Sequence, residues 1–125
     1  MHQSITNFNN IQSSIKSNQG KTNNKNNIKI IAVSKTFEIS HINPLIDYGH
    51  TDFGENKVQE AIEKWTIIKK NNVDLNLHLI GKLQTNKVKF ALNLFDYIHS
   101  LDSEKLAKKI SDYQEQNNIS AKFFI

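Results

Sequence analysis

The chain has 125 residues, a formal net charge of +4 and an apolar fraction of 38%, which fits one globular domain rich in polar residues. It contains no cysteine, which excludes disulfides, thiol nucleophiles and cysteine-ligated zinc, and no apolar stretch approaches the roughly 20 residues of a membrane-spanning helix. Acidic residues are interspersed with the sixteen lysines, so solvated helix faces explain the charge without a nucleic-acid partner. The N-terminus lacks the pattern of a secretory signal, and we expect a cytoplasmic protein.

The N-terminal segment predicts a short helix followed by a loop. Apolar residues recur there at spacings of three and four, at Ile5, Phe8, Ile11 and Ile15. Residues 17–27 contain no apolar residue and several turn formers, which is typical of a solvated loop. We therefore expect a helix and an Asn/Lys-rich loop over residues 1–27, and the main domain over residues 28–125.

From residue 28 onward, strand patterns alternate with helix patterns. Strands are expected over Ile28–Lys35, Thr51–Gly54, Leu75–Ile80, Phe95–His99 and Ala121–Ile125. In the first helix after Lys35, Pro44 disfavours α geometry at Asn43, and one alternative is a helix that begins with Asn43 as its cap. Ser103 can cap the last helix. Regular alternation with short connections predicts a parallel α/β sheet built from right-handed βαβ units.

Two common kinds of site are not indicated by the sequence. The four glycines form neither G-x-G-x-x-G nor a Walker A motif, so neither phosphate-loop fold is predicted. The five histidines have no spacing typical of metal ligands, and we expect no metal site. Lys35 is the remaining candidate for a functional residue, and it is the last residue of the first expected strand. By its position alone, a lysine at the end of a strand is usually a solvated residue with no functional role.

Three segments do resemble a known family in order and spacing, namely Ala32–Thr36, Phe53–Glu60 and His78–Lys87. The sequence resembles the pyridoxal phosphate homeostasis proteins from about Ile28 onward. This resemblance implies a (β/α)8 TIM-type barrel, similar to the N-terminal domain of alanine racemase, of which the chain would be a truncated first half with about strands 1–5. It departs from the family at Lys82, where proline is usual, and at Thr85, where serine is frequent.

The resemblance also implies a site. Pyridoxal 5′-phosphate (PLP) would be held as a Schiff base on Lys35, with Asn56, His78 and Gly81 near the cofactor. A Schiff base needs a neutral amine, which desolvation at the mouth of a barrel would favour and which arginine could not supply. Two of these residues have an alternative structural role: Asn56 as the N-cap of the following helix, and His78 as a hydrogen-bonded core histidine.

Three functional hypotheses follow. The first is a PLP homeostasis protein that carries the cofactor, has no catalytic residue of its own, and supplies apo-PLP enzymes. The second is a racemase-like PLP enzyme, which would need another acid or base opposite the lysine. The third is a non-functional fragment of a split gene, whose open sheet edges would require a second chain to complete the barrel. No membrane or nucleic-acid partner is expected.

Overall fold

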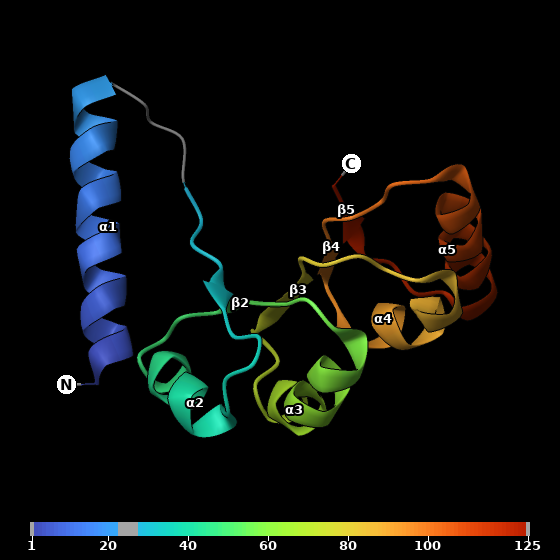
Figure 1. Ribbon diagram of the computed structural model, residues 1–125, viewed down its shortest axis with the longest axis horizontal. Helices are drawn as coiled ribbons and strands as arrows, with labels where there is room; N and C mark the ends of the chain where they lie inside the picture. The colour runs from blue at the N-terminus through green and yellow to red at the C-terminus, as the bar shows by residue number, and fades with distance from the viewer. Residues whose placement is uncertain (1, 23–27, 125) are drawn as a thin grey trace. The chain divides into compact units, whose positions relative to one another are not determined.

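A computed structural model describes residues 2–22 and 28–124 of the chain (Figure 1). The chain forms two compact units, one containing the N-terminal helix together with residues 28–30 and 37–50, the other containing residues 31–36 and 51–124. The domain boundary expected at residue 27 lies outside the described residues and stays a prediction.

The first unit contains two helices, α1 (Gln3–Thr22) and α2 (Ile39–Asp47). The helix α1 continues through residues 17–22, where we expected a loop, because no proline interrupts it and a single glycine costs only about 1 kcal/mol in a helix. The rest of the expected loop, residues 23–27, lies outside the described part. The ring of Phe8 lies 4.7 Å from that of His50, and the Tyr48 hydroxyl donates to Asn9 Oδ1 at 3.0 Å.

The helix α2 begins earlier than one alternative predicted. Its N-cap is Glu38, and Pro44 lies inside the helix, so a start at Asn43 is wrong. The ring of proline fixes φ near its helical value, although proline inside a helix loses one backbone hydrogen bond and crowds the carbonyl group one turn earlier. Burial of Ile42, which is 3% exposed, favours the longer helix. Gly49 follows the C-cap residue with a φ of +102°, a conformation that glycine adopts without strain.

The second unit is built on a five-stranded parallel sheet in the order β1-β2-β3-β4-β5. The strands are β1 (Ala32–Val33), β2 (Asp52–Glu55), β3 (Asn76–Leu79), β4 (Tyr97–Ile98) and β5 (Lys122–Phe123). They alternate with α3 (Val58–Asn71), the 3-10 turn η1 (Thr85–Lys87) with α4 (Val88–Leu94), and α5 (Glu104–Asn117). The predicted parallel α/β architecture is confirmed.

The strand β1 is much shorter than the expected strand Ile28–Lys35. It pairs with β2 through Ala32 and Val33, and the Ser34 amide extends this pairing by donating to Gly54 O at 2.9 Å. The strand β2 pairs with β3 over all of its residues, Asp52–Glu55, but with β1 only at Phe53 and Gly54. The β-branched residues of Ile28–Lys35 and their weak alternation also predict a strand buried on both faces. Val33 is 47% exposed, so this prediction is wrong here.

The two faces of the sheet differ. The helix face carries Phe53, whose ring lies 5.1 Å from that of Trp65 on α3, and both side chains are almost fully buried. Their sheet neighbours on this face, including Leu77, Leu79 and Ile98, complete the core. The opposite face, which we call the open face, carries the register partners Gly54, His78 and Tyr97. Ser103 caps α5 as predicted, accepting from the Leu106 amide at 3.2 Å.

Candidate functional site

Lys35 lies two residues after the C-terminal end of β1, in a turn with Thr36. The residue before it, Ser34, is anchored on the helix face, where its hydroxyl donates to the carboxylate of Glu55. Lys35 is therefore the first residue of the turn by which the chain leaves the sheet. Its side chain is exposed, and the desolvation that we expected around it is not provided by the part of the chain that the structure describes.

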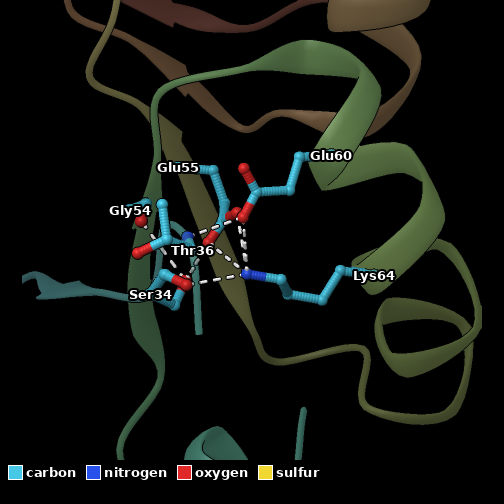
Figure 2. A network of polar contacts seen from close by, with 6 residues as sticks. All are labelled: Ser34, Thr36, Gly54, Glu55, Glu60 and Lys64. Atoms are coloured by element: carbon cyan, nitrogen blue, oxygen red, sulfur yellow. Dashed lines mark hydrogen bonds and ion pairs between the residues drawn. The ribbon is translucent and has the colours of Figure 1, made fainter. Parts of the chain in front are cut away.

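A polar network holds the backbone on both sides of Lys35 (Figure 2). Lys64, on α3, donates from Nζ to the Ser34 carbonyl oxygen at 2.7 Å and lies 3.1 Å from Glu55 Oε1. It also forms an ion pair with Glu60 Oε1 at 3.2 Å, and the Thr36 amide donates to that same oxygen at 2.6 Å. Three side chains that follow β1 in the sequence by some twenty to thirty residues thus fix the turn around Lys35.

Both carboxylates in this network are paired with Lys64. Glu55 is fully buried and Lys64 is 9% exposed, so each needs the other to avoid an unpaired buried charge. The Thr36 amide, followed by the charges of Lys64 and Lys57, holds the pKa of Glu60 below its usual value of 4.5, against an opposing effect of burial. Glu60 therefore remains an acceptor for the Thr36 amide at neutral pH.

The exits of β2 and β3 are locked together by Asn56 and Gly81. A Cβ atom added to Gly81 would lie 2.4 Å from the Asn56 carbonyl oxygen and 2.8 Å from Asn56 Cβ, so this position has room for glycine alone. The Gly81 carbonyl oxygen accepts from the Ser100 hydroxyl at 2.6 Å. Lys57, and not Asn56, is the N-cap residue of α3, so the structural role that we considered for Asn56 is wrong. Its side-chain oxygen is buried with no hydrogen-bond partner among the described residues.

His78 occupies the middle of the open face and is 3% exposed. Its Nε2 lies 2.9 Å from Asp52 Oδ1 and its Nδ1 lies 3.0 Å from His99 Nε2, so both ring nitrogens are engaged. The ring stacks on that of Tyr97 with centroids 4.4 Å apart. Burial, and then the neighbouring His78, lower the pKa of His99. These contacts match the alternative of a hydrogen-bonded core histidine.

Of the four residues expected near a cofactor, the structure brings Lys35, Asn56 and Gly81 to the C-terminal end of neighbouring strands, whereas His78 lies further back along β3. Sequence reasoning missed the network of Glu55, Glu60 and Lys64. The spacing of Glu60 and Lys64, four residues apart on a helix, was its only visible signal.

Among residues 2–22 and 28–124, no group of three or more metal-binding side chains comes together. Over the same residues, no helix is long and apolar enough to cross a membrane.

The sequence of this chain is similar to those of known proteins. No family model matches the chain. The pyridoxal phosphate homeostasis protein of Haemophilus influenzae is 39% identical over 94 residues, which cover 75% of this chain and 40% of the relative. The protein of that name from Vibrio cholerae is 34% identical over 114 residues, covering 89% of this chain and 48% of the relative. The chain belongs to the pyridoxal phosphate homeostasis protein family.

Solved structures agree with this family assignment. PipY of Synechococcus elongatus, solved with PLP bound, is 37% identical, with a TM-score of 0.72 over 83% of this chain and 50% of PipY. An unknown protein from Bifidobacterium adolescentis matches with a TM-score of 0.83 at 27% identity, over 92% of this chain and 51% of that protein. The chain thus has the fold of part of this barrel family, and it spans about 40% of the length of the first curated relatives that it matches.

Proposed function

We propose that this chain is the part of a pyridoxal phosphate homeostasis protein that holds PLP through Lys35. The observation that carries the proposal is the placement of Lys35 in the turn at the exit of β1, in a sheet whose next two strand exits carry Asn56 and Gly81. Such strand ends are where the functional groups of parallel α/β barrels gather. The PLP-bound neighbour PipY supports the choice of ligand.

The residues present fit one end of the cofactor. PLP supplies an aldehyde, which the neutral amine of a lysine converts to an imine with loss of water. The exposed side chain of Lys35 is accessible to such a ligand, and the side-chain oxygen of Asn56 is a buried acceptor that still lacks a donor among the described residues. Gly81 permits the close approach of strand exits on which the position of Asn56 depends. His78 would support the floor of the site through Asp52 and His99.

We further propose that the chain carries the cofactor and does not turn over a substrate. The relatives are named as homeostasis proteins, which supports this choice. A racemase needs an acid or base on the side of the substrate opposite the lysine. Both ring nitrogens of His78 are engaged with Asp52 and His99, so this histidine is not free for that role. Conversion of L-alanine to D-alanine by the PLP-loaded chain, lost in Lys35→Ala, would contradict the proposal.

The binding proposal is tested by mixing the purified chain with PLP, recording the absorption spectrum, and reducing the sample with borohydride before peptide mapping. We expect an imine absorption band and a label on Lys35, both lost in Lys35→Ala. The matched control is Lys105→Ala, which removes an exposed lysine of α5 and should leave the band unchanged. A folded chain without the band, or a label that persists elsewhere in Lys35→Ala, would overturn the proposal.

The family resemblance implies that the phosphate group is held by residues beyond the matched part. We therefore expect weaker PLP binding by this chain than by the full-length Haemophilus influenzae relative, measured by the same titration. Residues outside this chain, in a second chain or in a longer polypeptide, would complete the barrel and strengthen binding. We propose apo-PLP enzymes as recipients, and recovery of apoenzyme activity on addition of the PLP-loaded chain is the corresponding assay.

A further inference from the structure

The turn that follows Lys35 is strained. Thr36 has a φ of +65°, in the left-handed region, where a β-branched residue is rare. This conformation is unfavourable for a residue other than glycine, so surrounding contacts must hold it. Without such contacts the chain would relax toward negative φ at Thr36, and the peptide that joins Lys35 to Thr36 would be free to reorient.

The contact that holds this strained residue comes from α3. The Thr36 amide donates to Glu60 Oε1 at 2.6 Å, a hydrogen bond to a charged acceptor, which is stronger than a neutral one. Glu60 is 29% exposed and would be mobile by itself, but Lys64 holds the same oxygen at 3.2 Å. Lys64 is in turn fixed by the buried Glu55 and by the Ser34 carbonyl oxygen, on the other side of Lys35.

We propose that Glu60, held in place by Lys64, is a positioning residue for Lys35. It holds the peptide between Lys35 and Thr36 in the left-handed turn and so fixes the direction in which the lysine side chain leaves this turn. This inference rests on the proposed function where it concerns PLP, but the hold on Thr36 is a property of the chain alone. No substrate or cofactor contact by Glu60 is involved, since it lies on the helix side of the sheet with Lys64 and Glu55.

The first test measures the hold on Thr36 without any cofactor. In Glu60→Ala we expect the Thr36 amide to exchange with deuterium about tenfold faster than in the wild type, as the loss of one charge-assisted hydrogen bond predicts. The control is Glu63→Ala, which removes an exposed carboxylate of the same helix and should leave this exchange rate unchanged. Amides of α5 serve as an internal standard for global stability. Equal exchange at Thr36 in the wild type and in Glu60→Ala would overturn the proposal.

The second test measures the consequence for Lys35. Borohydride trapping of PLP on Lys35 should be about tenfold slower in Glu60→Ala than in Glu63→Ala. Adding Thr36→Asn should restore much of the rate, because asparagine tolerates the left-handed conformation that Glu60 otherwise holds. A purely structural role for Glu60 would not be rescued in this way, so equal trapping with and without Thr36→Asn would overturn the positioning role.

Two further measurements separate a failure of the positioning role of Glu60 from a failure of PLP binding at Lys35. If Glu60→Ala does not fold, Glu60→Gln carries the test, since it keeps an oxygen acceptor but loses the charge and should give rates between those of the wild type and a full loss. If the wild-type chain traps no PLP on Lys35, the proposed function fails, while exchange at Thr36 still decides whether Glu60 holds the turn.

Discussion

Replacing Gly81 by alanine gives the sharpest test of the contact between the exits of β2 and β3. The added Cβ would lie 2.4 Å from the Asn56 carbonyl oxygen and 3.0 Å from Asn56 Cα, both backbone atoms that can move only if the strand exit moves. Overpacking of this kind costs about 1–3 kcal/mol, against which alanine regains up to about 1 kcal/mol by restricting the unfolded chain. We therefore expect the free energy of unfolding to fall by roughly 1–2 kcal/mol.

Gly54→Ala is the matched control in the same sheet. Its Cβ would lie 3.0 Å from Ile31 Cγ2 and 3.3 Å from Ile80 Cδ1, which are side-chain methyl groups and not backbone atoms, so small shifts of these side chains relieve the contact. We expect a change within about 1 kcal/mol of zero. Urea unfolding followed by the fluorescence of Trp65, which is buried in this unit, measures both variants. If the two variants have equal free energies of unfolding, and the slope of this free energy against urea concentration is unchanged, the close contact at Asn56 does not constrain the fold.

Three other predictions concern stability. Because the pKa of His99 is lowered in the folded chain, the unfolded chain binds more protons. The contribution of His99 to stability should therefore be present above about pH 6.5 and be lost as the pH falls through the pKa of the folded chain. The urea midpoint should fall over this pH range, and His99→Gln should weaken its dependence on pH. Ser103→Ala should cost about 1 kcal/mol in the same assay by removing the cap on the Leu106 amide, whereas Ser111→Ala, exposed within α5, should cost nothing. Trp65→Ala should lower the free energy of unfolding by about 3–5 kcal/mol, measured by circular dichroism, because it removes a buried aromatic side chain. Trp65→Phe should lower it much less, because phenylalanine keeps a buried ring and lacks the indole N–H, which has no partner among the described residues; equal losses in the two variants would contradict this.

The alternation of elements could be predicted because it depends on local patterns. The alternation of strand and helix patterns and the polar cap at Ser103 both depend on residues close together in the sequence, and both predictions were confirmed. The lengths of the strands could not be predicted, because the ladder of β1 depends on which residues pair with β2, a segment about twenty residues later. The continuation of α2 through Pro44 likewise depends on the burial of Ile42, which a local rule does not include.

The candidate site was predicted only in part for a similar reason. The family motifs contain Lys35, Asn56 and Gly81, and the structure adds the reason for the glycine, which is the contact with the Asn56 backbone. They do not indicate that Glu60 and Lys64 reach the backbone beside Lys35, since this depends on how α3 packs against the sheet. The exposure of Lys35 was not anticipated either, because we expected a closed barrel mouth around it.

The neighbours Lys64 and Trp65 give α3 two separate attachments to the sheet, one through ions at the end of β1 and one through the apolar core. Consecutive residues of an α-helix point about 100° apart, so a single rotation of the helix satisfies both attachments. Inserting one residue between them would turn the rest of the helix by that angle and force the chain to give up one attachment. Lys64 and Trp65 together therefore fix the rotation of α3 about its own axis. This rotation determines which carboxylate of the helix lies beside the turn after Lys35.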